Sequence, residues 1–261
     1  MRVTFLGTGG AGGVPRFGCT CPACQRAKTN HRHVRRPCSA LIEDSNHKIL
    51  LDAGLMDLHD RFEPGELSAI VLTHYHPDHV QGLLHLRWGK GESIPVYGPP
   101  DPDGFTDLFK HPGILDISDL SAFQALELGE FSLTPMPLNH SKLTFGYAIA
   151  HRNGARFAYL TDTLGLPEES ADYLRQWRPG HIAVDCSHPP ADVSGKAPQN
   201  HNDVTAALAM IEQSGAEQGW LTHLGHETDC WLMANASALP NNVTPAADGL
   251  CFDITTSLSP A

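Results

Sequence analysis

Four residues that can bind metal ions lie within six positions of the sequence, His74, His76, Asp78 and His79. Imidazole nitrogens and carboxylate oxygens are common ligands of divalent ions. His74 and His76 are two residues apart, so their side chains point to the same side of an extended chain. Four ligands this close together cannot all reach one ion comfortably, but two ions can share them. The run therefore predicts a site for two divalent metal ions.

The neighbouring segments predict that this run follows a strand and enters a helix. Ile70–Leu72 is apolar, Pro77 favours a turn, and His79–Trp88 has helical periodicity. Ligands at the carboxyl end of a strand face the crevice in which α/β proteins place their sites. The alternative is a histidine-rich loop that binds no metal. Four potential ligands at this spacing, between a strand and a helix, favour the metal site.

A second group of potential ligands consists of three cysteines, Cys19, Cys21 and Cys24. A closed zinc site needs four ligands, often three cysteines and one histidine. We expect His226 to be the fourth, with Cys38 as the competing candidate. This structural zinc would attach the N-terminal loop to the loop that carries His223 and so support the first site. A redox pair or unrelated buried thiols are the alternatives, and three cysteines within six residues favour zinc.

The composition limits the class of protein. The 261 residues are 41% hydrophobic and 18% charged, which suits a globular chain with a sizeable core. A formal net charge of −11 and the lack of a basic stripe argue against a nucleic-acid partner. No apolar stretch reaches the roughly 18 residues of a membrane span, and the start lacks a signal-peptide core. With an odd number of cysteines, we expect a cytoplasmic protein without a membrane partner.

Short apolar runs bounded by glycine, proline or aspartate predict strands. They are Val3–Leu6, Ala40–Ile42, Ile49–Leu51, Ile70–Leu72, Ile94–Tyr97, Phe131–Thr134, Phe145–Ile149, Arg156–Leu160, Ile182–Val184, Trp220–Leu221 and Leu250–Ile254. Helices are expected at His79–Trp88, at Glu168–Gln176 after Pro167, at Asp203–Gln213 with Asn202 as N-cap, and at Asp229–Ala236. This order predicts an α/β fold of mixed sheets between helices. We expect one domain, residues 1–261, with a zinc-binding loop near 19–24.

The order of the ligands resembles that of the metallo-β-lactamase superfamily, whose signature is His-x-His-x-Asp-His. The resemblance identifies His140, Asp162 and His223 as the later ligands and Asp52 as an aspartate that orients a ligand. It assigns one ion to His74, His76, His140 and Asp162, and the other to Asp78, His79, Asp162 and His223. Each ion keeps room for water or substrate, which is typical of catalytic sites. Two ions about 3.5–4 Å apart can hold the oxygens of a phosphoryl displacement.

Further segments are similar to the PhnP family, the cyclic-phosphate phosphodiesterases of the carbon–phosphorus lyase pathway. They are the cysteine loop, Thr73–His79, Val96–Pro100, Leu138–Tyr147, Asp185–Pro190 and Asn200–His201. The resemblance implies a four-layer αβ/βα sandwich, two catalytic Mn²⁺ ions with Zn²⁺ as the alternative, and one structural Zn²⁺. It also implies a homodimer. The implied reaction is hydrolysis of 5-phospho-α-D-ribosyl 1,2-cyclic phosphate to ribosyl 1,5-bisphosphate during phosphonate catabolism.

The same resemblance implies roles for residues around the metal ions. A metal-bridging hydroxide attacks phosphorus, His201 is the general acid, and Asp78 counts as a catalytic residue as well as a ligand. Lys142 is expected to meet a substrate phosphate, and Ser187 and His188 to line the pocket. The alternatives are that His201 is an ordinary loop residue and that Lys142 is solvated. The glycines from Gly7 to Gly13 do not have P-loop spacing and predict a tight turn.

Other members of the fold provide rival hypotheses. A tRNA 3′-processing endonuclease would need a basic RNA-binding face, which the acidic composition lacks. A coenzyme PQQ-biosynthesis protein also carries a cysteine-rich loop, and a thioester hydrolase fits the metal ligands alone. A metal-binding module without hydrolytic activity is a different class, and it would retain metal ions while hydrolysing no phosphodiester.

Overall fold

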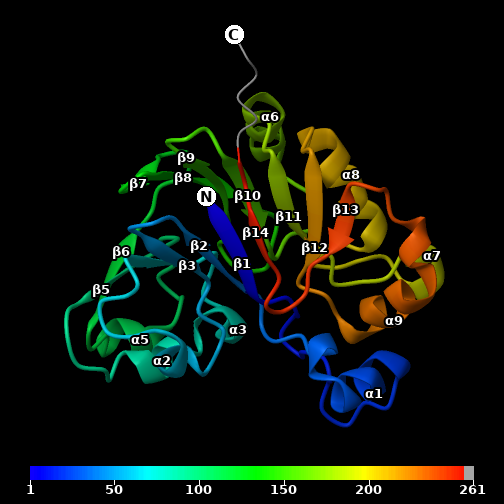
Figure 1. Cartoon of the computed structure of the whole chain (residues 1–261), viewed down its shortest axis with the longest axis horizontal. Coiled ribbons are helices and arrows are strands. Elements are labelled where there is room, and N and C mark those ends of the chain that lie inside the picture. Colours follow the sequence, from blue (N-terminus) through cyan, green and yellow to red (C-terminus); the bar gives the residue numbers. More distant parts are fainter. Residues whose placement is uncertain (256–261) are drawn as a thin grey trace.

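Two seven-stranded sheets form the framework of the protein (Figure 1). The computed structural model describes residues 1–255. The first sheet has the order β14 (Cys251–Asp253), β1 (Arg2–Gly7), β2 (Ser39–Glu43), β3 (Lys48–Leu51), β4 (Ala69–Val71), β5 (Ile94–Gly98) and β6 (Leu115–Asp119). The second has the order β13 (Val243–Pro245), β12 (Gln218–Thr222), β11 (His181–Asp185), β10 (Arg156–Leu160), β9 (Phe145–His151), β8 (Phe131–Pro137) and β7 (Leu126–Leu128). Each sheet mixes parallel and antiparallel pairs.

Helices flank the sheets (Figure 1). In chain order they are α1 (Pro22–Thr29), the 3₁₀ helix η1 (His31–His33), α2 (Leu58–Arg61), α3 (Pro77–Val80), α4 (Leu83–Leu86), α5 (Thr106–Lys110), α6 (Glu168–Trp177), α7 (Ala191–Ser194), α8 (Val204–Ser214), α9 (His226–Asn235) and the 3₁₀ helix η2 (Ala236–Ala238). In the described part of the chain, none of them is long and apolar enough to cross a membrane.

Alternating side chains divide the apolar interior into layers. On β3, Ile49 packs into the cluster between the sheets, whereas Leu50 packs against the helices outside the first sheet. On β9, Ile149 faces the cluster between the sheets and Ala148 faces the helices outside the second sheet. This period of two is the pattern of strands buried on both faces. The result is the expected four-layer αβ/βα sandwich in a single domain.

Every predicted strand overlaps an observed one, but three strands were missed. β6 and β7 alternate apolar with charged residues, and β13 is short and ends in proline. The predicted helix His79–Trp88 was wrong as one continuous element. It is divided into α3 and α4, because the N–H of Gly82 donates to the carbonyl oxygen of Ala53 at 2.8 Å instead of to one within its own helix.

The helix predictions in the second half of the chain were closer. α6 and α8 match within a residue, and α9 begins at His226, three residues before the predicted start. The N-cap of α8 is Asp203 and not Asn202, because the Asp203 side chain accepts a hydrogen bond from the backbone N–H of Ala206. Asn202 instead binds the loop after β10 through Gly165 N–H.

Candidate metal centre and its cavity

Three imidazole rings converge beyond the carboxyl ends of strands in both sheets. His74 follows β4, His76 is the N-cap of α3, and His140 follows β8. His76 Nδ1 lies 2.9 Å from His74 Nε2 and 3.1 Å from His140 Nε2. Ligand atoms of these three residues and of Asp162 all lie within 4.8 Å of one another. The fold therefore brings together the four residues that the sequence assigned to one ion.

A second group lies beside the first and consists of Asp78, His79 and His223. Asp78 and His79 lie in the first turn of α3, and His223 follows β12. Asp78 Oδ2 lies 3.5 Å from His79 Nε2 and 3.7 Å from His223 Nε2. Both Nε2 atoms are buried, and neither has a hydrogen-bond partner among the described residues. Buried polar atoms without partners are costly, so their convergence indicates that they face a cation.

Asp162 connects the two groups because its carboxylate oxygens face different histidines. Oδ2 lies 3.6 Å from both His74 Nε2 and His140 Nε2. Oδ1 lies 3.2 Å from His79 Nε2 and 3.3 Å from His223 Nε2. A carboxylate that bridges two metal ions needs one oxygen directed to each ion. The position of Asp162 agrees with the bridging role that the sequence assigned to it.

Hydrogen bonds behind the ligands orient their rings. Asp52 Oδ2 accepts a hydrogen bond from His79 Nδ1 at 2.9 Å, and Asp52 Oδ1 accepts one from Thr73 N–H at 2.8 Å. Ser187 Oγ lies 2.8 Å from His223 Nδ1. A histidine held at Nδ1 presents Nε2 to the metal centre, which fixes the tautomer of the ligand. The contact agrees with the expectation that Asp52 orients the His79 ring.

Three of these residues have a left-handed backbone. The φ angles are 57° at Asp52, 63° at Asp162 and 54° at His223. Each residue lies immediately or almost immediately after a strand, where the chain turns at the sheet edge. For residues other than glycine this region costs roughly 1–3 kcal/mol each, and such strain is common at functional sites. The surrounding fold therefore stabilises a local conformation that these side chains alone would disfavour.

Burial and neighbouring charges set the ionisation of the group. Burial lowers the pKa of His74, His76 and His140 below the ordinary histidine value. Burial alone would raise the pKa of Asp162, but the imidazoles around it, first that of His223, hold this pKa well below its usual range.

Burial would lower the pKa of His79 and His223, but the carboxylates around them, first Asp162, outweigh it and raise the pKa of both rings, to about 9 for His223. Neutral imidazoles and ionised carboxylates are the forms that bind divalent ions, so a bound cation would displace the protons from these two rings. The donor set thus fits a two-metal site, and nitrogen and oxygen ligands of this kind accept manganese, zinc or iron.

His201 lies beside the metal-ligand groups and forms a close pair with a buried carboxylate. His201 Nδ1 is 2.6 Å from Asp185 Oδ2, and its ring stacks on that of His223 with centroids 4.8 Å apart. Asp185 also accepts hydrogen bonds from Thr163 N–H and from Ser187 N–H. The carboxylate fixes the His201 ring by one nitrogen and leaves Nε2 available for proton transfer at the cavity.

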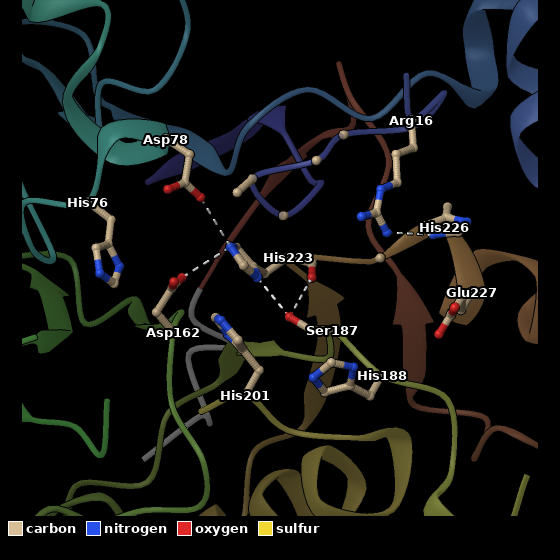
Figure 2. A pocket seen from close by; sticks show the side chains of 15 residues that line it. Arg16, His76, Asp78, Asp162, Ser187, His188, His201, His223, His226 and Glu227 are labelled. Atoms are coloured by element: carbon tan, nitrogen blue, oxygen red, sulfur yellow. Dashed lines mark hydrogen bonds and ion pairs between the residues drawn. The ribbon is translucent and has the colours of Figure 1, made fainter. Parts of the chain in front are cut away.

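A cavity of about 360 Å³ opens over these groups (Figure 2). Its lining includes Ser187, His188 and His201, as the sequence predicted. Lys142 is not among the residues that line it. Its ammonium group pairs with Asp101 Oδ2 at 3.0 Å, so its expected contact with a substrate phosphate stays a prediction.

The cysteine group forms a separate cluster at the edge of the cavity. His226 Nδ1 lies 3.5 Å from the Sγ atoms of Cys19 and Cys21, and Cys24 completes the set. A tetrahedral zinc ion with ordinary bond lengths would separate nitrogen and sulfur ligands by about 3.6 Å. Burial raises the pKa of Cys21, but bonds from Cys24 N–H and His226 outweigh it and lower this pKa to about 6. These residues can therefore hold a structural zinc ion.

The alternative prediction, that Cys38 is the fourth zinc ligand, was wrong. Its thiol is buried in the core, where Sγ lies 3.2 Å from the Tyr159 hydroxyl and 3.2 Å from the Thr222 hydroxyl. These contacts place Cys38 with the hydroxyl groups between the sheets and not with the other three thiols. Burial accordingly raises the pKa of this thiol to about 11.

Sequence reasoning gave no role to two charged residues that line the cavity, Arg16 and Glu227. Glu227 immediately follows His226, so its position could have been inferred from the expected zinc ligand. Arg16 lies between the glycine turn and the cysteines, and no spacing rule indicates its direction. The turn itself also lines the cavity through Gly10, Gly12 and Gly13. At Gly10 a Cβ atom would lie 3.1 Å from the His223 ring.

Comparison with known proteins places these observations in a family. Residues 47–224 match the family described as "Beta-lactamase superfamily domain". An octanoyltransferase of Porphyromonas gingivalis is 27% identical over 269 positions, which cover 96% of this chain and 51% of that protein. Coenzyme PQQ synthesis protein B of Methylobacterium radiotolerans is 33% identical over 112 positions, 38% of this chain and 37% of that protein. The chain thus spans about half or less of the length of these curated relatives.

Solved structures extend the similarity over nearly the whole chain. A structure described as a new diphosphatase from the PhnP family has a TM-score of 0.81 and 24% identity, and the match covers 97% of this chain and 98% of that one. Zinc-bound PqqB from Methylobacterium extorquens has a TM-score of 0.76 and 20% identity, with 97% and 100% coverage. At these identities the likeness establishes the fold.

Proposed function

The chain belongs to the metallo-β-lactamase superfamily, and from that premise we propose that it is a metal-dependent phosphodiesterase that acts on a small phosphorylated sugar. Its fold and its His/Asp clusters are those of a metal-dependent hydrolase of this superfamily. The observation that carries the proposal is the division of the Asp162 carboxylate between two imidazole groups. Beside it, His201 pairs with Asp185 and stacks on the His223 ring, with the ring centroids 4.8 Å apart.

The metal ions would be held by the two ligand groups that share Asp162. Once bound, two divalent ions would supply positive charge to the phosphoryl oxygens and acidify water at the reacting phosphorus. The chain's own residues position this chemistry. Asp52 and Ser187 hold the rings of His79 and His223, and the Asp78 carboxylate lines the cavity.

His201 is proposed to deliver the proton that hydrolysis requires. When water adds across a phosphodiester, the hydroxyl group goes to phosphorus and the departing sugar oxygen must gain a proton. Asp185 accepts a hydrogen bond from His201 Nδ1 and fixes the ring, so that its Nε2 side faces the cavity and would donate to this oxygen. The pair has the arrangement of a positioned general acid with a carboxylate that orients it.

The substrate we propose is 5-phospho-α-D-ribosyl 1,2-cyclic phosphate, opened to ribosyl 1,5-bisphosphate. The similarity to the PhnP family and the cavity of about 360 Å³, a size suited to a small ligand, support this choice. Opening the ring breaks the bond from phosphorus to the 2-oxygen, and His201 would protonate that oxygen. The net charge of −11 argues against the rival tRNA substrate.

The test is hydrolysis by protein whose metal content has been measured, with manganese supplied. The substrates are the sugar cyclic phosphate, a short precursor tRNA and a phosphoric anhydride such as ADP-ribose. We expect fast opening of the cyclic phosphate, with formation of the 1,5-bisphosphate followed by phosphorus NMR. Failure to open it with both catalytic metal ions bound would refute the substrate assignment. Preferential cleavage of the tRNA or the anhydride would instead identify the corresponding alternative.

A further inference from the structure

Arg16 extends over the cavity and meets the outer nitrogen of His226. Arg16 Nη1 lies 3.2 Å from His226 Nε2, and both residues line the same cavity as Asp78 and Asp162. Figure 2 shows the guanidinium group beside the His226 ring, across the cavity from those two carboxylates. Among residues 1–255, no carboxylate forms an ion pair with Arg16, so its charge is not neutralised by a neighbouring side chain.

A hydrogen bond to the cysteine cluster positions the backbone of Arg16. The backbone N–H of Arg16 donates a hydrogen bond to Cys24 Sγ at 3.3 Å. The side chain then passes over the glycine turn, where a Cβ atom at Gly12 would lie 3.8 Å from Arg16 Cδ. The position of the guanidinium group therefore depends on the same cluster that holds His226.

The Arg16 guanidinium group and the His226 ring cannot hydrogen-bond each other when a zinc ion occupies the cysteine cluster. Nδ1 of His226 faces the thiols of Cys19 and Cys21 at 3.5 Å, so zinc would take that nitrogen and the ring proton would sit on Nε2. Arginine has donors only. Two sets of N–H donors that are 3.2 Å apart at Nη1 and Nε2 need a shared acceptor, and a phosphate oxygen meets this need.

We propose that Arg16 and His226 form an anion subsite for a phosphate monoester on the substrate, separate from the phosphoryl group that reacts. The reacting phosphorus would lie at the ligand groups around Asp162, and the sugar would span the cavity between the two sites. Figure 2 shows Glu227 below the His226 ring, with its carboxylate directed away from the Arg16 guanidinium. Its negative charge would repel an anion, which favours a position of the phosphate next to Arg16. The cysteine cluster thus takes part in substrate selection by setting the donor on His226.

Because this subsite deepens the proposed function, the kinetic test compares two cyclic phosphates. One is 5-phosphoribosyl 1,2-cyclic phosphate and the other is ribosyl 1,2-cyclic phosphate without the 5-phosphate. In the unaltered enzyme, kcat/KM should favour the phosphorylated compound. Arg16→Gln should lower kcat/KM for that compound by about 10–100-fold, mainly through KM, because one charge-assisted contact is lost. It should leave kcat/KM for ribosyl 1,2-cyclic phosphate unchanged. A preference that survives Arg16→Gln would overturn the subsite.

The matched control is Arg32→Gln, which removes the same charge from an exposed position in η1 that does not line the cavity. It should preserve the preference, and both variants should retain zinc. A loss of preference in Arg32→Gln equal to that in Arg16→Gln would reduce the effect to net charge and overturn the proposal.

A binding measurement tests the subsite if neither cyclic phosphate is hydrolysed, the result that would defeat the proposed function. Calorimetry on the metal-loaded protein should show that ribose 5-phosphate binds and that ribose does not. Arg16→Gln should weaken the binding of ribose 5-phosphate by about 10-fold or more, whereas Arg32→Gln should not change it. Equal affinity in the unaltered protein and Arg16→Gln would overturn the subsite, whatever the reaction that the enzyme catalyses.

Discussion

The two candidate metal sites are built from different parts of the fold. The ligands of the centre around Asp162 come from the ends of β4, β8, β10 and β12 and from α3, and most are buried. The cysteine cluster draws two ligands from the loop before α1, one from α1 and one from the start of α9, and two of its three thiols are partly exposed. The first centre has a carboxylate shared between groups and an adjoining cavity, whereas the second offers four ligands to one ion. This difference separates a site arranged for reaction from one arranged for support.

The strongest test of this contrast is removal of the shared carboxylate. Asp162→Asn keeps the size of the side chain but removes the charge that both imidazole groups face. We expect loss of at least one catalytic ion and a fall in activity of more than about 10³-fold, because the two-metal chemistry depends on both ions. Metal analysis should still find the zinc in the cysteine cluster. Loss of that zinc as well would contradict the independence of the two sites.

Replacing His201 tests whether the first centre needs more than metal ions. His201→Ala should retain both catalytic ions, because the ligand groups around Asp162 remain intact. Turnover should fall by about 10²–10⁴-fold as the proton donor is lost. Metal content and the thermal unfolding midpoint, measured beside kcat, separate this result from a folding defect. An unchanged kcat would exclude His201 from proton transfer.

Replacing a cysteine should affect stability more than turnover. Cys21→Ser keeps an oxygen that can accept the α1 capping bond from Cys24 N–H but removes one thiolate. We expect loss of one zinc per chain and a decrease of about 3 kcal/mol in the free energy of unfolding, because a metal that ties α1 to α9 is lost. Urea titration measures this change. The kcat should stay within about 10-fold, and a complete loss of turnover would show that the cluster acts on the reaction itself and not only on stability and substrate selection.

A smaller effect is expected at an aspartate remote from both sites. Burial would raise the pKa of Asp44, but hydrogen bonds from the N–H groups of Asn46 and His47 and from His151 outweigh it and lower this pKa. A lowered pKa means that ionised Asp44 stabilises the fold at neutral pH and that this contribution is lost as pH falls through the folded-state pKa. Asp44→Asn should cost about 1 kcal/mol at pH 7. Urea titrations at decreasing pH should show the difference between the proteins shrinking, and a constant difference would contradict the assignment.

The sequence predicted elements whose signals are local. The ligand run from His74 to His79 and the cysteine spacing are both read within a few residues, and apolar runs located most strands. Two features escaped because they depend on contacts between distant segments. The predicted helix is interrupted where the N–H of Gly82 donates to the carbonyl oxygen of Ala53, and Arg16 reaches a cavity formed by both halves of the chain.

The left-handed backbone at Asp52, Asp162 and His223 also bears on how this chain could be re-engineered. Glycine would adopt this backbone conformation with less strain, so the side chains at these positions contribute through the contacts they make and not through local stability. Glycine substitutions at these turns would remove the side chains that form the metal centre and would relieve the backbone strain at the same time. Substitution of these three residues by glycine would therefore suit a design that uses the fold as an inactive scaffold. A design that uses the fold for catalysis should keep all three.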